Sequence, residues 1–323
     1  MKPTVVRPVV LAPNWLGDAV MALPAIADLR RAWPDAVLTI AARPGIAPLF
    51  TMVPFVDSVL PLDVARTTMP SFETAVLLPN SFHAALRTWR AGIPERWGYR
   101  TDWRRALLTR AVEAPSGLHQ VAFYQYLVKA LGFPTVAAAP RVTVSDTLAA
   151  TATRELVGAG WDGRRPLVAL APGAAYGGAK RWPPAYFAEL AGALARDGVQ
   201  SVVVGSTADL PVAREIEGHL GTDIVLNLMG TDLPTLAAIL AACRAVVSND
   251  SGAMHLAAAV GTHVTAVFGP TDERITRPSG DGHVVLTEQV WCRPCLMREC
   301  PIDHRCMRGV GVARVAGAVR QML

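Results

Sequence analysis

Short apolar runs alternate with longer amphipathic stretches along most of the chain. In the first half, this pattern predicts strands over residues 5–12, 37–42 and 75–79 and a helix over 19–33. The strand candidates are apolar throughout, which is typical of strands buried on both faces of a parallel sheet. The first half is therefore predicted to be a parallel sheet with helices on both faces.

The pattern weakens after residue 141 and then restarts. The stretch SDTLAATATRELVGAGWDGRRP, residues 145–166, is predicted to begin as a helix and to continue as a connector rich in Gly and Arg. The second series has predicted strands over 167–173, 200–206, 224–230, 245–250 and 263–270, with helices over 184–196, 211–220 and 234–245 and after residue 251. We therefore predict two doubly wound, Rossmann-like α/β domains, 1–160 and 161–323, with the carboxyl ends of both sheets facing one cleft.

Composition fits two ordinary folded domains. Of the 323 residues, 51% are hydrophobic and 18% are charged, which gives no signature of disorder. No apolar run approaches the length of a membrane span, and the N-terminus does not resemble a secretory signal. We expect a cytoplasmic protein, for which peripheral contact with a membrane surface stays open.

The net charge of +5 comes almost entirely from arginine, because lysine occurs only at positions 2, 129 and 180. Seven arginines lie in one short region: Arg87, Arg90, Arg96, Arg100, Arg104, Arg105 and Arg110. This region is either a solvated basic face or a dock for an anionic partner.

The stretch SNDSGAMHLAAAV, residues 248–260, follows an apolar strand and opens a helix. Its turn, formed by Asp250, Ser251 and Gly252, would place N–H groups and a helix N-terminus at the carboxyl end of a sheet, which suits a phosphate group. An ordinary helix cap would also explain the Asp and the Ser. His255 follows about one helical turn later, and we expect it to have a supporting role.

The stretch LAPGAAYGGAKRWPP, residues 170–184, is a second phosphate-like loop. Gly173, Gly177 and Gly178 allow close approach of the backbone, and Lys180 supplies a cation in a chain that has few lysines. The P-loop pattern GxxxxGK[ST] is absent. A simple loop with surface cations is the alternative.

The stretch APNWLGDAVMALPAI, residues 12–26, ends the first predicted strand. Gly17 allows a tight turn, and Asp18 stands at the start of the following helix. A carboxylate held there can act as a general base, or it can simply cap the helix.

Four cysteines lie close together near the C-terminus: Cys292, Cys295, Cys300 and Cys306. Because disulfides are disfavoured in the cytoplasm, this segment suggests a structural zinc ion, with His304 as an alternative ligand. Four reduced thiols in a loop are the other interpretation.

Four blocks in this order resemble the lipopolysaccharide heptosyltransferases, glycosyltransferase family 9: PNWLGDAVMALPAI, LLPNSFHAALRTWRAGIPERWGYR, APGAAYGGAKRWP and SNDSGAMHLAAAVGTHVTAVFGPTD. The pattern is most similar to the members that add the second heptose of the inner core. This resemblance implies a GT-B enzyme with two Rossmann-like domains, which inverts the anomeric centre and needs no catalytic metal. It would transfer L-glycero-D-manno-heptose from ADP-heptose to the first heptose of the lipid A inner core.

The resemblance also implies roles for single residues. Asp18 matches the general base and Lys180 matches the lysine that binds the donor phosphates. The remaining donor contacts would come from Gly17, Gly173, Asp209, Met229, Gly230, Thr231, Asp250, Ser251, Gly252 and His255. Acceptor contacts would come from Asn80, Ser81, Arg96 and Arg100. Asp209 and the segment 229–231 could instead belong to plain turns and caps.

Other classes of protein explain fewer of these features. An oxidoreductase would need a GxGxxG motif after the first strand of either half, and neither half has one. A nucleotide-sugar epimerase would share the architecture but use no acceptor. A nucleic-acid-binding protein would use the arginines with Trp89, Trp97, Tyr99 and Trp103, but would leave both phosphate-like loops unexplained. We therefore expect a monomeric transferase that does not bind nucleic acid.

Overall fold

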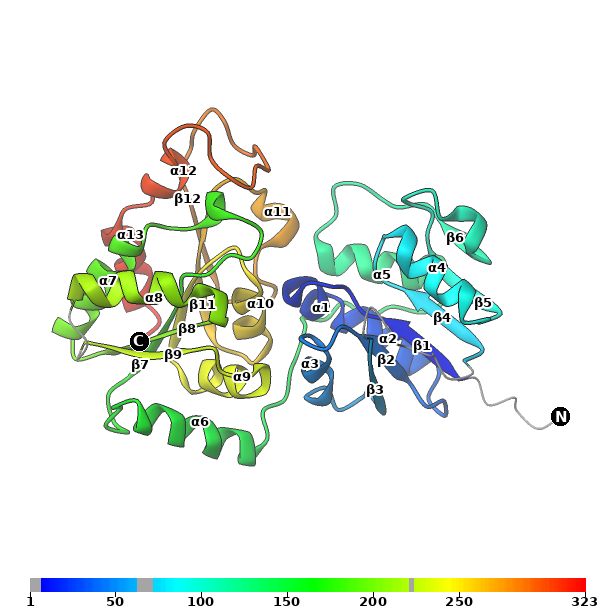
Figure 1. Ribbon diagram of the computed structural model, residues 1–323, viewed down its shortest axis with the longest axis horizontal. Coiled ribbons are helices and arrows are strands. Elements are labelled where there is room, and N and C mark those ends of the chain that lie inside the picture. The colour runs from blue at the N-terminus through cyan, green and yellow to red at the C-terminus, as the bar shows by residue number, and fades with distance from the viewer. Residues whose placement is uncertain (1–6, 63–71, 221–223) are drawn as a thin grey trace. The chain divides into compact units, whose positions relative to one another are not determined.

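The computed structural model describes residues 7–62, 72–220 and 224–323. The chain forms two compact units, one ending at Thr143 and the other beginning at Val144. Figure 1 shows a sheet with helices packed on it in each unit. In the described ranges, no helix is both long enough and apolar enough to cross a membrane.

The N-terminal unit alternates strands with helices. Its strands are β1 (Pro8–Leu11), β2 (Thr39–Ala42), β3 (Ser58–Pro61), β4 (Thr74–Leu77), β5 (Glu95–Tyr99) and β6 (Arg110–Val112). Its helices are α1 (Leu16–Met21), α2 (Leu23–Ala32), α3 (Ala47–Thr51), α4 (Phe82–Arg90) and α5 (Gln120–Ala130), with a 3-10 turn at Arg105–Leu107. All strand pairs are parallel, in the order β3-β2-β1-β4-β5-β6.

The C-terminal unit repeats this plan. Its strands are β7 (Leu167–Ala171), β8 (Gln200–Gly205), β9 (Val225–Met229), β10 (Ala245–Asn249), β11 (His263–Phe268) and β12 (Val284–Thr287). Its helices are α6 (Asp146–Gly158), α7 (Pro184–Arg196), α8 (Leu210–Leu220), α9 (Leu233–Ala242), α10 (Gly252–Ala259), α11 (Glu273–Thr276), α12 (Arg305–Arg308) and α13 (Val312–Arg320), with 3-10 turns at Gly178–Lys180 and Thr207–Asp209. The parallel strand order is β12-β11-β10-β7-β8-β9.

Both sheets therefore have the same Rossmann order, and each reverses direction once. The reversal lies between β1 and β4 in the first unit and between β7 and β10 in the second. The central strands β1, β2, β4, β7 and β10 are buried along their whole length. The predicted doubly wound fold is confirmed in both units, and the reversal is the point at which such sheets bind ligands.

The long helix predicted over 19–33 is interrupted. The structure has α1 and α2 instead, because Pro24 lies in the first turn of α2 and has no N–H to continue a helix from α1. The predicted strand at 5–12 is β1, although residues 5 and 6 lie outside the described ranges. The strands β3, β5, β6 and β12 were not predicted. Three of them, β3, β5 and β6, lie toward one edge or the other of the first sheet and carry exposed or polar residues that break the apolar pattern.

The boundary between the two units lies after Thr143, earlier in the chain than the predicted boundary between residues 160 and 161. The helix α6 belongs to the C-terminal unit, where it packs against α9. Ala152 and Leu156 on α6 are fully buried. The weaker hydrophobic pattern after residue 141 indicated the region of the boundary. The packing of α6 then shows which unit this helix joins.

Replacing Leu156 with Ala should lower the free energy of unfolding of the C-terminal unit by about 2–5 kcal/mol, because the change leaves a cavity under α6. The neighbouring Val157 is 51% exposed, so Val157→Ala should change the same quantity by about 0.5 kcal/mol or less. Urea unfolding of the intact chain measures both. Equal effects of the two substitutions would contradict the assignment of α6 to this core.

Candidate functional site

The carboxyl ends of β7 and β10 bring Lys180 and Asp250 together. Lys180 Nζ lies 2.5 Å from Asp250 Oδ2, and Thr271 Oγ1 donates to the same oxygen at 2.7 Å. Only 13% of the Lys180 side chain and 6% of the Asp250 side chain are exposed, so this ion pair is largely shielded from water. The two phosphate-like loops predicted from the sequence thus meet in one site, and Asp250 holds Lys180 in place.

Asn249, the last residue of β10, joins the same two loops and was not singled out from the sequence. Its side chain is fully buried. Its Oδ1 accepts from Trp182 N at 2.9 Å, and its Nδ2 donates to Pro172 O at 2.7 Å. Asn249 therefore fixes both ends of the loop that carries Lys180. The sequence feature that could have indicated this role is its position between an apolar strand and Asp250.

The helix α10 begins at Gly252, next to this ion pair. Ser251 is its N-cap residue but makes no capping bond; its Oγ lies 3.0 Å from Ser248 Oγ. The first N–H groups of a helix have no acceptor within the helix, and they favour an anion. His255 is buried at 5% exposure, and its supporting role stays a prediction. Together with Lys180, the start of α10 can bind an anionic group such as a phosphate.

The other predicted donor residues gather at the ends of β7, β8 and β9. An added Cβ at Gly173 would lie 2.5 Å from Asp209 Oδ2, so the backbone of the Lys180 loop approaches Asp209 closely. Asp209 completes a capping box with Ser206, through bonds of 3.1 and 2.7 Å to the backbone N and Oγ of Ser206. The structure therefore shows the capping role for Asp209, while contact with a ligand stays a prediction.

The turn after β9 is built around Gly230. Gly230 has a φ of +83°, a left-handed conformation that favours glycine, and its N–H donates to Gly205 O at 2.9 Å. Met229 Sδ lies close to Gly205, and Thr231 Oγ1 donates to Leu228 O at 3.3 Å. Residues 229–231 are thus placed at the same end of the sheet as Gly173.

The cysteine-rich segment supports the Lys180 loop directly. Tyr176 Oη donates to Leu296 O at 2.8 Å, Gly178 N to Glu299 Oε1 at 2.9 Å, and Ala179 N to Arg298 O at 2.9 Å. The Lys180 ammonium lies 4.8 Å from the centre of the Tyr176 ring, and the Arg298 guanidinium lies 5.3 Å from it. Three successive anchors therefore determine the path of the loop up to Lys180.

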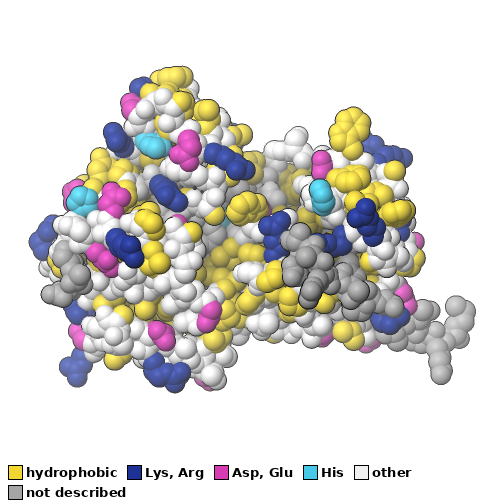
Figure 2. Space-filling model, in the orientation of Figure 1, with side chains coloured by type: hydrophobic (Ala, Val, Ile, Leu, Met, Phe, Trp, Pro, Cys, Tyr) yellow, Lys and Arg dark blue, Asp and Glu magenta, His cyan; other side chains and the backbone are white. Residues whose placement is uncertain are grey.

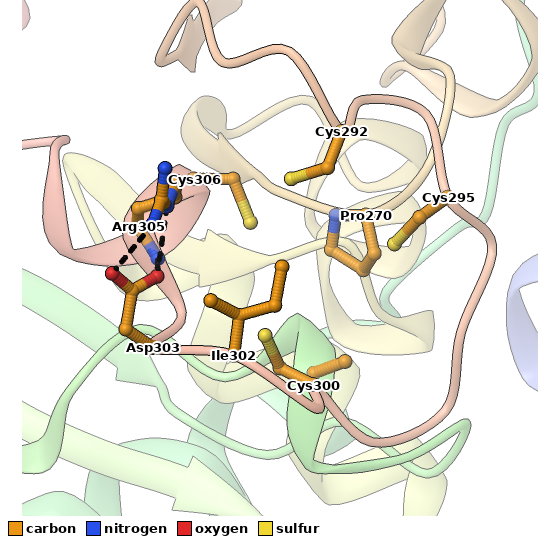
Figure 3. Close-up of a pocket in the computed structure, with 9 residues that line it drawn as sticks. Pro270, Cys292, Cys295, Cys300, Ile302, Asp303, Arg305 and Cys306 are labelled. Atoms are coloured by element: carbon orange, nitrogen blue, oxygen red, sulfur yellow. Dashed lines mark hydrogen bonds and ion pairs between the residues drawn. The ribbon is translucent and has the colours of Figure 1, made fainter.

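The four cysteines line one pocket, together with Pro270, Ile302 and the Asp303–Arg305 ion pair (Figure 3). All four are free thiols, and burial raises the pKa of Cys306. Within the described ranges, no three His, Cys, Asp or Glu side chains come close enough together to hold a metal ion. As they are placed, the thiols do not form a zinc site, so structural zinc stays a prediction and no chemical step depends on it.

Asp18 lies in the first turn of α1, at the carboxyl end of β1. The N-cap of α1 is Trp15, so Asp18 does not occupy the capping position that the sequence left open. Asp18 is half-buried, and its negative charge adds to burial in raising the pKa of the Tyr124 phenol on α5. Gly17 precedes it within α1. A carboxylate on this rigid turn can accept a proton from a bound hydroxyl.

The predicted acceptor residues have different surroundings. Ser81 is the N-cap of α4 and accepts from Ala84 N at 3.3 Å, and Asn80 precedes it with an exposed side chain. Arg96 donates to the backbone oxygens of Leu107, Ile93 and Pro94. Arg100 pairs with Glu113. Arg96 therefore supports the local backbone, and Arg100 already has an acidic partner.

A pocket of about 230 Å³ opens at the carboxyl ends of β1, β2 and β4. Its polar lining consists of Asn14, Arg43, Ser81, His83 and Arg87. Of these, only Ser81 was predicted as an acceptor contact. Arg43 was missed because it lies outside the arginine-rich region, and only the sheet order brings it beside the end of β1.

The arginine-rich region is not one continuous basic face. Arg104 is fully buried and donates to the backbone oxygens of Tyr99, Pro79 and Ser81. Burial lowers its pKa to about 10. On the face shown in Figure 2, the Lys and Arg side chains are scattered among other types rather than continuous. Trp97 and Tyr99 are 7% and 0% exposed, so two of the aromatic rings needed for base stacking are unavailable.

Asn249→Ala should lower the free energy of unfolding of the C-terminal unit by about 2–5 kcal/mol, because a backbone N–H and a C=O stay buried without partners. Asn227 is an exposed asparagine that donates to Glu217, so Asn227→Ala should change this quantity by about 0.5 kcal/mol or less. Thermal or urea unfolding compares them. A loss below about 1 kcal/mol for Asn249→Ala would refute the anchoring role.

Comparison with known proteins agrees with this arrangement. Residues 66–305 match the family described as glycosyltransferase family 9 (heptosyltransferase). The chain is 31% identical over 296 residues to lipopolysaccharide heptosyltransferase 2 of Escherichia coli K12, covering 83% of this chain and 84% of the relative. The solved structure of E. coli ADP-heptose LPS heptosyltransferase II is 28% identical and superposes with a TM-score of 0.86 over 98% of both chains. A family 9 glycosyltransferase from Veillonella parvula, 19% identical, has the same fold, with a TM-score of 0.86 over 100% of this chain and 98% of that one. These matches confirm the predicted resemblance: the chain belongs to glycosyltransferase family 9, the heptosyltransferase family.

Proposed function

We propose that this glycosyltransferase moves L-glycero-D-manno-heptose from ADP-heptose to the first heptose of the lipopolysaccharide inner core. The observation that carries this proposal is the similarity to lipopolysaccharide heptosyltransferase 2 of E. coli, which extends over 83% of this chain and 84% of that protein. The family match over residues 66–305 includes Lys180 and Asp250. The superposition on the solved E. coli structure extends over 98% of this chain.

The C-terminal unit supplies the features that a sugar diphosphate donor needs. Lys180 and the start of α10 offer positive charge at one place. Asp250 holds the lysine there, and Thr271 donates to the same Asp250 oxygen. When the donor reacts, negative charge grows on the departing diphosphate. A preorganised cation and a helix N-terminus stabilise that charge more than they stabilise the ground state.

Asp18 would act as the general base. The acceptor hydroxyl oxygen attacks the anomeric carbon of the donor heptose, and its proton passes to the Asp18 carboxylate. The bond from the anomeric carbon to the diphosphate oxygen breaks, and ADP leaves with the electron pair. A single displacement of this kind inverts the anomeric configuration, and it requires one carboxylate on the face opposite the leaving group.

In this proposal, the charge of the diphosphate is balanced by Lys180 and α10, so catalysis proceeds without a metal ion. The protein would work as a monomer in the cytoplasm, at the inner face of the inner membrane, where it meets the lipid-anchored acceptor. The arginines of the N-terminal unit suit an acceptor that carries carboxylates and phosphates.

Purified protein should release ADP from ADP-heptose only when heptosyl-Kdo2-lipid A is present, and a chelator should leave the rate unchanged. A coupled ADP assay, with mass spectrometry of the lipid product, measures both. Release of ADP without an acceptor would indicate an epimerase or a hydrolase. Donor binding without transfer to this acceptor would instead point to a different acceptor for the same donor site.

Asp18→Asn should lower kcat by about 10²–10⁴-fold, because the proton of the acceptor hydroxyl loses its acceptor, while binding of ADP-heptose stays nearly the same. Asp146 provides a matched control, since it is an exposed Asp in the first turn of α6. Asp146→Asn should leave kcat unchanged. Comparable transfer by the Asp18→Asn protein would remove the general-base assignment.

Lys180→Ala should raise the Kd for ADP by about 10–100-fold, because a buried charge-assisted contact to phosphate is lost. Lys129 is an exposed lysine at the end of α5 and serves as the control. Isothermal titration calorimetry of both variants measures the difference. An unchanged Kd for Lys180→Ala would show that the phosphates bind elsewhere.

A further inference from the structure

The pocket at the reversal of the first sheet contains positively charged side chains that have no role in the reaction described above. Its wall is formed by residues that follow β1, β2, β3 and β4 and by residues of α4. Arg43 and Arg87 contribute guanidinium groups, and His83 contributes an imidazole. Among the described residues that line this pocket, no side chain is acidic.

Within the part of the chain that the structure describes, both guanidinium groups lack a partner. Neither Arg43 nor Arg87 forms an ion pair or a side-chain hydrogen bond with any residue in the ranges 7–62, 72–220 and 224–323. Four other arginines of this unit are engaged: Arg30 with Asp57, Arg31 with Asp28, Arg100 with Glu113, and Arg110 over the Trp97 ring. Unpaired guanidinium groups in a concave wall suit a carboxylate or a phosphate, which arginine binds through two parallel hydrogen bonds.

The rim of the pocket is held rigidly. The buried Arg104 donates to the backbone oxygens of Pro79 and Ser81, which border the pocket. Asp102 Oδ2 accepts from Phe82 N at 2.5 Å, so the first N–H of α4 is already satisfied. The start of α4 is therefore fixed, and the attraction for an anion comes from the arginine side chains rather than from that N–H group.

The pocket and the proposed base share one segment of the chain. Asn14 in its wall and Asp18 belong to the same short segment after β1. A sugar whose anionic neighbour is bound by the arginines would have its hydroxyl groups next to this segment. Such anchoring determines which hydroxyl reaches the base, because small errors in position cost much of the rate.

We propose that Arg43 and Arg87 bind an anionic group of the acceptor, a carboxylate or a phosphate, and thereby select the hydroxyl that Asp18 deprotonates. This inference rests on the proposed heptose transfer. It adds a binding subsite for the acceptor, with two residues that determine specificity. The anion bound there offsets positive charge on the two guanidinium groups.

The test compares Arg43→Gln, Arg87→Gln and the double variant of the full chain with Arg90→Gln as the matched control. Arg90 is an exposed arginine on the same helix, outside the pocket. With heptosyl-Kdo2-lipid A, each single pocket variant should lose about 10–100-fold in kcat/KM for the acceptor. The KM for ADP-heptose should stay within about twofold, which a general folding defect would not allow. Arg90→Gln should behave as the unchanged protein.

Two altered acceptors identify the anion: one whose Kdo carboxyl groups are reduced to alcohols, and one whose phosphates are removed. If a carboxylate is bound, the loss caused by the pocket variants disappears with the reduced acceptor; if a phosphate is bound, it disappears with the dephosphorylated one. A loss of the same size with both altered acceptors would overturn the proposal, and so would a double variant within about twofold of the unchanged protein. Failure of the unchanged protein to transfer heptose would instead refute the proposed function itself.

Discussion

Parallel strands cannot be joined by hairpins, and this constraint determines where the polar residues of the candidate sites lie in each unit. Each strand must be followed by a crossover that returns to the opposite end of the sheet, and in both units the direction of the crossovers reverses once. At the reversal, the loops diverge and leave the carboxyl ends of two neighbouring strands open. Asp18 and Ser81 follow β1 and β4, while Lys180 and Asp250 follow β7 and β10. Within each unit, these polar residues therefore lie at the same end of the sheet.

Within the C-terminal unit, the candidate site depends on how one lysine is held. Lys180 would be a long, mobile cation on a glycine-rich loop if the loop were free. Asp250 holds its ammonium end and is itself held by Thr271. Asn249 ties both ends of the loop to β10, and residues 296–299 anchor the part between them. This explains what the cysteine-rich segment contributes whether or not it binds a metal ion. Its backbone supports the loop on which the proposed phosphate contact depends.

In the N-terminal unit, the structure separates arginines that look alike in the sequence. Arg96 and Arg104 bind backbone carbonyl groups, Arg100 pairs with Glu113, and Arg110 covers a tryptophan ring. These arginines stabilise the region between β4 and α5. Arg43 and Arg87 instead point to a role in binding, because they line a pocket and have no acidic partner in the described ranges.

The sequence by itself determined the local elements and the residue types at the ends of the central strands. Apolar runs of strand length and amphipathic helices predict two doubly wound units, and the turns with Gly17, Gly173 and Gly252 stand out because they interrupt that pattern. The edge strands, the place of α6 and the partners of each polar side chain needed the tertiary structure. Arg43 and Arg87 are 44 positions apart in the chain, and Lys180 and Asp250 are 70 apart (87 − 43 and 250 − 180). Whether side chains so far apart in the chain come together depends on the order of the strands in the sheet, which no local pattern encodes.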